Sequence, residues 1–181
     1  MSLIKTNNII SLIGPMGSGK SCVGKSLSRR IKTDFADMDL LIENKVGMSI
    51  SKIFEEHGEN YFRHVEKEVL LEFLKNYDSE SLRKCVISCG GGIVIDEDSR
   101  KRLKENTLSI WLNVSPERSI QRIKQGTRPL LDCEDPEEKV EKIFKERKLF
   151  YEYTAGMIID TENLTIIEVV DNICKELDWK E

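Results

Sequence analysis

The sequence predicts an α/β fold in three layers, with a five-stranded parallel sheet between two layers of helices. Short apolar runs alternate with amphipathic helical patterns along the chain, and this alternation is typical of parallel strands joined by helices. A glycine-rich loop of phosphate-binding type joins the first strand to the first helix. A second glycine run follows a later buried strand at its carboxyl end, where open α/β sheets bind their ligands.

The first two elements flank a complete phosphate-binding loop, Gly14–Ser21, in which Gly, four residues, Gly-Lys and Ser follow in order. An apolar strand over 9–13 precedes the loop, and a helix over 23–31 follows it. This is the context that the motif requires. A glycine-rich turn with an incidental lysine is disfavoured, because all eight positions match in this context. The loop predicts a nucleotide-binding protein.

Each residue type in the loop has a physical task. Gly17 and Gly19 allow backbone conformations in which successive N–H groups surround a phosphate. Lys20 meets the β- and γ-phosphate oxygens, and Ser21 offers a hydroxyl to Mg²⁺. The helix that begins here adds the positive end of its dipole.

A second strand is expected over 33–39, where apolar residues alternate with acidic ones. Its end carries Asp37 and Asp39, which would project toward the nucleotide crevice beyond the carboxyl ends of the strands. A solvated turn that caps the next helix is the alternative interpretation. The position of the two carboxylates relative to the phosphate-binding loop favours the functional one.

Helical segments fill residues 40–76. The expected segments are 40–46, ending at Gly47; 50–56, capped by Ser49; and a longer helix from 59, after a stop at Gly58. The longest segment buries an apolar stripe at helical spacing. Arg63 lies one step off this stripe, near the beginning of that helix.

A compact apolar run over 85–89 predicts a buried parallel strand that leads directly into Gly90, Gly91 and Gly92. A flexible turn is one explanation for these glycines, but a turn needs only one or two. Three successive glycines favour a ligand that lies against bare backbone.

The remaining elements follow in order. A short helix capped by Asp96 or Asp98 is expected to run through 105, and a strand follows over 108–114. Ser115-Pro116 opens the next helix, which is expected to stop at Gly126. A helix over 136–153 and a strand over 157–161 come next. Residues 126–134 lack periodicity and form a candidate lid with Arg128. A capping box at Thr165–Glu168 begins the last helix. Its core-facing residues are expected to be Ile166, Val169, Val170, Ile173 and Leu177.

Length, charge and cysteine content exclude several classes of protein. The chain has 181 residues, enough for one domain with a substantial core, and a formal net charge of −4. No basic field is present to attract nucleic acid or an anionic membrane, and no apolar run is long enough to span a bilayer. We expect a cytoplasmic protein with a small-molecule partner. Five scattered cysteines and two histidines predict reduced thiols and no zinc site.

With these pieces placed, the chain resembles the shikimate kinases, small bacterial enzymes of the nucleoside monophosphate kinase-like P-loop fold. The resemblance covers residues 9 to about 161. Besides the loop it rests on 35–39, Ser49-Ile50 with Ile53-Phe54, Gly58-Glu59 with Phe62-Arg63 and Glu66, 90–92, 128–131, and Arg147 with Tyr151. It implies transfer of the γ-phosphate of ATP to the 3-hydroxyl of shikimate, by a monomer. It also implies one domain over 1–181, with a helical substrate-binding insertion at about 37–65 and a mobile lid at about 122–136.

The resemblance assigns roles residue by residue. The catalytic residues would be Lys20, Asp39 and Arg128, and the Mg²⁺ residues Ser21 and Asp37. ATP would be bound by Gly17, Ser18, Gly19, Lys20, Ser21, Cys22, Arg122 and Arg128. Shikimate would be bound by Asp39, Arg63, Gly90, Gly91, Gly92 and Arg147. The chemistry agrees, because shikimate carries one carboxylate and three hydroxyls, which suit two arginines, an aspartate and backbone N–H groups.

This chain departs from the family pattern near the nucleotide. Cys22 and Cys89 stand where the family usually has threonine. A basic residue that some members use near the adenine is absent from 161–164, which leaves Arg122 as the expected stacking partner.

Three other functions fit parts of the pattern. A gluconate kinase-like enzyme shares the loop and the two aspartates, and a nucleoside monophosphate kinase is a more distant possibility. The triple glycine together with Arg128-Pro129-Leu130-Leu131 disfavours both. An inactive kinase-like regulatory module would be expected to lack Lys20, Asp39 or Arg147, and this chain has all three.

Overall fold

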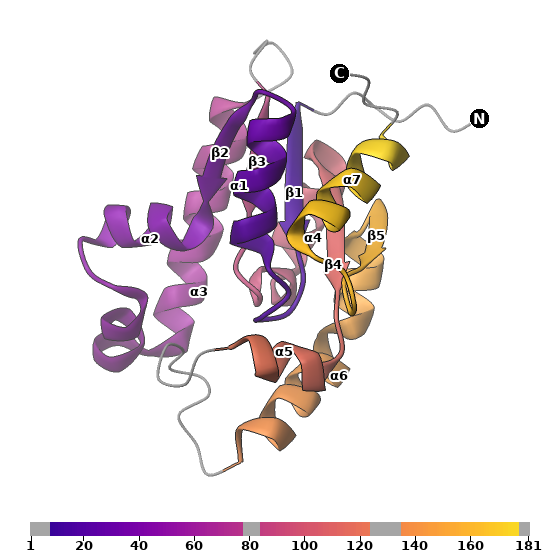
Figure 1. Cartoon of the computed structure of the whole chain (residues 1–181). Helices are drawn as coiled ribbons and strands as arrows, with labels where there is room; N and C mark the ends of the chain where they lie inside the picture. The colour runs from indigo at the N-terminus through magenta and orange to yellow at the C-terminus, as the bar shows by residue number, and fades with distance from the viewer. Residues whose placement is uncertain (1–7, 78–83, 124–134, 178–181) are drawn as a thin grey trace.

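The computed structural model describes residues 8–77, 84–123 and 135–177. Within these ranges five parallel strands form one sheet in the order β2-β3-β1-β4-β5, which confirms the predicted sheet (Figure 1). The strands are β1 (Ile9–Ile13), β2 (Asp34–Asp37), β3 (Cys85–Ser88), β4 (Leu108–Asn113) and β5 (Met157–Asp160).

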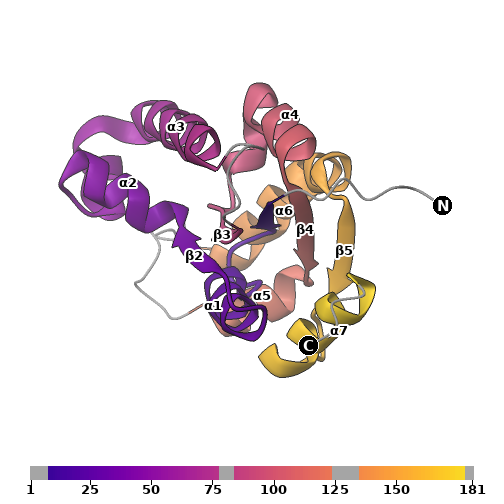
Figure 2. The same ribbon diagram turned by 90° about the horizontal axis from the view of Figure 1, so that it is seen from above.

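Helices cover both faces of this sheet. They are α1 (Lys20–Arg30), α2 (Met38–Val46), α3 (Ile50–Asn76), α4 (Glu97–Asn106), α5 (Pro116–Arg122), α6 (Pro136–Thr154) and α7 (Ile166–Glu176), with a short 3₁₀ turn, η1 (Ile93–Ile95), after β3. Seen from above, α1 and α7 lie on one side of the sheet and α3 and α4 on the other (Figure 2). The three predicted layers are therefore present.

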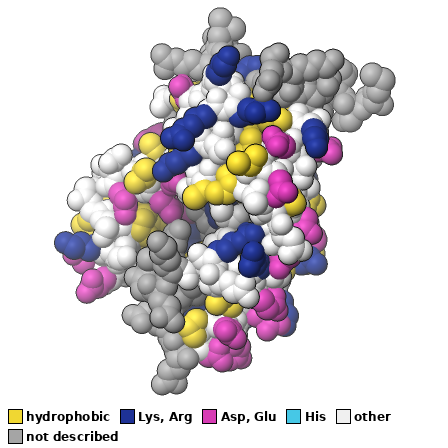
Figure 3. All heavy atoms as spheres, in the orientation of Figure 1, with side chains coloured by type: hydrophobic (Ala, Val, Ile, Leu, Met, Phe, Trp, Pro, Cys, Tyr) yellow, Lys and Arg dark blue, Asp and Glu magenta, His cyan; other side chains and the backbone are white. Residues whose placement is uncertain are grey.

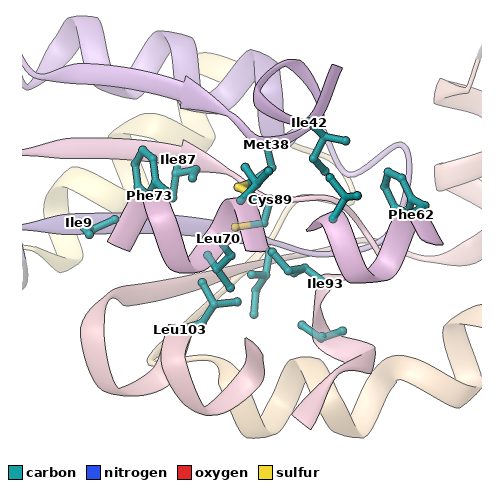
Figure 4. Packing of buried hydrophobic residues seen from close by; sticks show 14 of the residues in the cluster. Ile9, Met38, Ile42, Phe62, Leu70, Phe73, Ile87, Cys89, Ile93 and Leu103 are labelled. Carbon is teal, nitrogen blue, oxygen red and sulfur yellow. The ribbon is translucent and has the colours of Figure 1, made fainter. Parts of the chain in front are cut away.

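The core divides along the sheet because successive side chains of a strand point to opposite faces. Ile9 and Ile13 of β1 pack with α3 and α4, in a cluster that also contains Met38 and Leu70 (Figure 4). The intervening Leu12 packs with α1 and α7. A strand with both faces buried has a near-continuous apolar sequence, and β1 is apolar except for Ser11.

Several predicted helix boundaries are confirmed by their caps. Ser49, Asp96, Ser115 and Thr165 each accept a backbone N–H at a helix start, and Thr165 forms the predicted capping box with Glu168. Asp96, rather than Asp98, is the cap of α4. Gly58 interrupts α3 with a φ of 78°, so the two predicted helices meet at a kink.

Four boundaries or orientations differ from the predictions. The helix α5 ends at Arg122, with Ile123 as its C-cap, instead of continuing to Gly126. The first helix begins at Lys20, within the phosphate-binding motif. β2 ends at Asp37, and Asp39 lies in the first turn of α2, because the Asp37 side chain accepts the Asp39 N–H and caps that helix. Ile166 was expected in the core but is 45% exposed.

Part of the chain lies outside the described residues, including Arg128, Cys133 and most of the predicted lid. Among the helices that are described, none is both long and apolar enough to cross a membrane.

The strand order positions the ligand-binding residues. β3 lies between β1 and β2, and the strands are parallel, so their carboxyl ends share one edge. The phosphate-binding loop follows β1, Asp37 ends β2, and Gly90–Gly92 follow β3. The triple glycine therefore lies between the phosphate-binding loop and the two aspartates.

Candidate active site

The phosphate-binding loop has the conformation that its glycines predict. Gly17 and Gly19 have φ values of 74° and 89°, in the left-handed region that disfavours other residues. A Cβ atom on Gly17 would also lie 2.4 Å from the carbonyl oxygen of Ser119 in α5. Gly19 is the N-cap of α1, so the first turn of that helix opens toward the loop. A loop of this conformation at a helix N-terminus is the arrangement that binds phosphate in nucleotide-binding proteins.

The loop is held by side chains from two elements. Lys20 Nζ donates to the carbonyl oxygens of Gly14 and Pro15, at 2.9 and 2.8 Å. The hydroxyl of Ser119 donates to the carbonyl oxygen of Met16. The helix α5, which leads toward the predicted lid, is thus tied directly to the loop.

A cavity of about 560 Å³ opens in front of the loop, a size typical of small-molecule sites. Its walls include Cys22, Arg118, Arg122 and Ile166. Basic side chains gather over α5 on this side of the molecule (Figure 3), and α5 carries both arginines. Arg122 is oriented by hydrogen bonds to the carbonyl oxygens of Thr161 and Glu162 at 2.7 and 3.3 Å. The exposure of Ile166 follows from its place on this wall.

Ser21 lines the same cavity and contacts Asp37 behind it. The Ser21 hydroxyl donates to Asp37 Oδ2 at 2.6 Å and lies 3.2 Å from the Ser88 hydroxyl. A hydroxyl and a carboxylate are hard oxygen donors, which suit Mg²⁺ held mainly by water and phosphate oxygens. The two residues fit such an ion. The other Asp37 oxygen accepts the Asp39 N–H and caps α2, so the capping interpretation is confirmed, while the metal-binding role stays a prediction.

A second, smaller cavity adjoins the first. Its walls include Phe54, Arg63, Gly92 and Arg147, so it brings together residues of α3, α6 and the triple glycine. Met16, Asp39, Gly90 and Gly91 line both cavities. A molecule in the second cavity would face a nucleotide in the first across the Asp39 carboxylate.

The two ends of the glycine run lie close to charged side chains of α3. A Cβ atom on Gly90 would lie 2.6 Å from Glu66 Oε1, and a Cβ on Gly92 would lie 2.3 Å from Arg63 Nη2. Charged side chains of α3 therefore approach this turn closely, and glycine gives them room. The ligand that the sequence predicts against this backbone stays a prediction.

Glu66 is a site residue that the sequence-based assignment of roles omitted. Its carboxylate is 3% exposed and accepts from Arg63 Nη1 at 2.6 Å. Burial raises its pKa, and the nearby Asp39 raises it further, while Arg63 opposes both. Oε1 has no hydrogen-bond partner within the described residues and lies beside Gly90 in the second cavity. The available signal was a carboxylate on the apolar stripe of α3, four residues after Phe62.

The structure brings together nearly all of the predicted site residues. Those on the walls of the two cavities are Gly17, Ser18, Gly19, Lys20, Ser21, Cys22, Asp39, Arg63, Gly90, Gly91, Gly92, Arg122 and Arg147. Asp37 joins them through Ser21. Arg128 lies outside the described residues.

Comparison with known proteins identifies the family. A family model described as shikimate kinase matches residues 16–178. A shikimate kinase of Legionella pneumophila (strain Corby) is 39% identical over 178 residues, which cover 98% of both chains. The solved shikimate kinase from Acinetobacter baumannii in complex with shikimate is 33% identical, with a TM-score of 0.88, over 95% of this chain and 93% of that one.

A gluconokinase from Sinorhizobium meliloti superposes with a TM-score of 0.56 at 15% identity, over 97% of this chain and 98% of that one. That likeness shows a shared fold alone. The family model, the curated relative and the solved complex agree over nearly the whole chain, and the motifs that carry the resemblance line two adjoining cavities. The chain belongs to the shikimate kinase family.

Proposed function

We propose that this protein transfers the γ-phosphate of ATP to the 3-hydroxyl of shikimate, giving shikimate 3-phosphate and ADP. The observation that carries the proposal is the pair of cavities that meet at Asp39. Phosphoryl transfer asks a protein mainly to align donor and acceptor and to neutralise charge. Two adjoining cavities, one with a phosphate-binding loop and one with two arginines, meet that demand.

In this proposal ATP occupies the larger cavity. The loop N–H groups and Lys20 bind the β- and γ-phosphates, which replace the Gly14 and Pro15 carbonyls as acceptors for Nζ. The adenine lies between Arg122 and the apolar wall that contains Ile166. Arg128, in the predicted lid, is the further cation for the phosphates.

Mg²⁺ would be held through Ser21 and Asp37, and when bound it neutralises phosphate charge. The chain's own residues prepare that place. Asp37 is oriented by capping α2, and Ser21 is held by its hydrogen bond to Asp37.

Shikimate occupies the smaller cavity. Its carboxylate pairs with Arg63 and Arg147, which approach the triple glycine from α3 and α6. Glu66 holds Arg63 in place from its buried side. Asp39 accepts a hydrogen bond from the 3-hydroxyl and orients that oxygen toward the γ-phosphate. Whether Asp39 also takes the proton is a question for its asparagine variant.

A coupled assay of ADP release tests this function. We expect turnover with shikimate, and none above background with gluconate or with a nucleoside monophosphate. If gluconate is phosphorylated and shikimate is not, the proposal is wrong and the protein is a gluconate kinase-like enzyme. No turnover with any acceptor would favour a regulatory module. The monomeric state, the cytoplasmic location and the division into insertion and lid stay predictions.

Arg63→Ala and Arg147→Ala are each expected to raise the KM for shikimate by about tenfold or more, with the KM for ATP changed less than about twofold. Each guanidinium contributes charge-assisted hydrogen bonds of roughly 1.5–3 kcal/mol to the carboxylate. Steady-state kinetics in both substrates measures this difference. Arg102→Ala, on the solvent side of α4, is the matched control and should leave both constants unchanged. Equal losses for ATP and shikimate would place the two arginines elsewhere.

Cys22→Thr is expected to lower the KM for ATP several-fold without changing that for shikimate. Cys22 is exposed, lies in the first turn of α1 and lines the larger cavity. A hydroxyl at this position donates to phosphate better than a thiol, and that difference is about 1 kcal/mol. Cys174→Ser, on α7, is the control for loss of a thiol.

Alkylation provides a second readout of Cys22. Burial raises the pKa of the Cys89 thiol, whereas Cys22 is exposed, so modification with ATP protection should map to Cys22 by mass spectrometry. If Cys22→Thr binds ATP no better than the parent and ATP does not slow alkylation of Cys22, this side chain does not face the phosphates.

A further inference from the structure

The carbonyl group of Gly91, in the middle of the triple glycine, is held by two side chains of α6. The Tyr151 hydroxyl donates to it at 2.5 Å, and Arg147 Nη1 donates to it at 3.4 Å. The two residues are four positions apart, so they share one face of the helix. Arg147 has a proposed task at the shikimate carboxylate, but no part of the proposed function accounts for Tyr151.

We propose that Tyr151 is a positioning residue for the acceptor substrate, which fixes the peptide between Gly91 and Gly92 through the Gly91 carbonyl. The inference rests on the proposed function and adds a residue to it. A peptide unit is planar and trans, so its N–H points opposite to its C=O. When Tyr151 holds the carbonyl toward α6, the Gly92 N–H is turned away from α6. Gly91 and Gly92 both line the shikimate cavity.

Glycine makes such a support necessary. Without a Cβ atom, a run of three glycines has more backbone freedom than any other sequence, and freezing it on substrate binding would cost affinity. A donor that orders the turn beforehand removes that cost. The 3.4 Å contact of Arg147 is too long to do this well, and a stronger pull on Gly91 would draw its guanidinium from the substrate.

Tyr151 itself is rigidly placed. It is 1% exposed, and its ring stacks on Trp111 of β4, with centroids 5.7 Å apart and an angle of 21° between planes. Burial raises its pKa to about 12, so the hydroxyl stays protonated and remains a donor throughout the physiological range. Trp111 in turn lies against Gly14, since a Cβ there would be 3.4 Å from its Cδ1 atom. The phenol is therefore anchored to the central sheet.

Tyr151→Phe tests the inference because it removes the hydroxyl and keeps the stacked ring. We expect the KM for shikimate to rise about tenfold, since one buried hydrogen bond and the order it gives are lost. The KM for ATP should stay within about twofold. Thr154→Val is the matched control on the same helix: it removes another buried hydroxyl that donates to a carbonyl, that of Phe150, at 2.7 Å. It should lower the melting temperature and change neither KM.

The outcomes separate the inference from the function on which it rests. If the parent enzyme does not phosphorylate shikimate, the proposed function fails and the inference fails with it. If the parent is active and Tyr151→Phe keeps its KM for shikimate, or loses affinity for both substrates equally, the inference alone is overturned. The same shift in Thr154→Val would show a general effect of loosening α6 and would also overturn it.

A measurement on the unaltered protein covers the case in which Tyr151→Phe does not fold. With Tyr151 in place and no shikimate present, the ¹⁵N order parameters of Gly91 and Gly92 should be those of rigid backbone, about 0.85. Values below about 0.6 would mean that the turn is not ordered in advance, which contradicts the inference.

Discussion

Replacing Lys20 by methionine is expected to lower kcat by about 10²–10⁴ while leaving a folded protein. The side chain supplies a positive charge where negative charge moves between the β- and γ-phosphates, and removal of a positioned charge has an effect of this size. Methionine keeps most of the length of the side chain without the charge. The Lys20 bonds to Gly14 and Pro15 lie within the loop, and Lys20 belongs to neither hydrophobic cluster of the sheet, so we expect the core to stay intact. Steady-state kinetics and a thermal melt measure the two effects.

Lys25→Met is the matched control, because Lys25 lies on the same helix, exposed and outside both cavities. It should retain parental kinetics. If the Lys20→Met variant keeps more than about a tenth of the parental kcat, Lys20 is not a catalytic residue of the transfer step.

Asp39→Asn is expected to lower kcat by about 10²–10⁴ as well, with a smaller rise in the KM for shikimate. Asparagine preserves the shape of the side chain but removes the negative charge that faces the acceptor hydroxyl. Asp39 lies in the first turn of α2 and lines both cavities, so its loss acts where donor and acceptor meet. The variant also relieves repulsion of the buried Glu66, which should help rather than harm stability.

The control is Asp34→Asn, in the preceding strand and exposed to solvent. It should change neither kcat nor KM. Kinetics of Asp39→Asn over a range of pH separate its two possible tasks. If Asp39 is a general base, the variant loses the acidic limb of the rate profile, where protonation of the carboxylate lowers the rate of the parent; if Asp39 only positions the hydroxyl, the variant has a lower rate at every pH. Near-normal kcat and KM in Asp39→Asn would contradict both roles, that of general base and that of positioning residue.

Local sequence signals were sufficient to predict a helix start where a single capping residue fixes the backbone conformation. Ser49, Ser115 and Thr165 were predictable caps because a hydroxyl at a helix start satisfies N–H groups that have no partner in the helix. The end of β2 was less predictable. Asp37 caps α2 through the nearby Asp39 N–H and also accepts from Ser21, and this second contact, sixteen residues away in sequence, is one that local signals do not report.

For Ile166, the local signal led to a wrong prediction. Helical spacing placed it with Val169 and Ile173, which are buried. Periodicity reports only that a residue is apolar and on one face of the helix; it does not distinguish a core from a ligand cavity. The wall of the nucleotide cavity is apolar too, and Ile166 lies there.

The sequence by itself determined the phosphate-binding loop and the alternation of strands and helices, because each of these depends mainly on residues close together in the chain. The tertiary structure decided which of these parts meet. Insertion of β3 between β1 and β2 brings the triple glycine between the loop and Asp39. Packing of α3 and α6 on one face brings Arg63, Glu66 and Tyr151 to the same turn. Those contacts join residues that are distant in sequence, and they form only when the strands pair in the observed order.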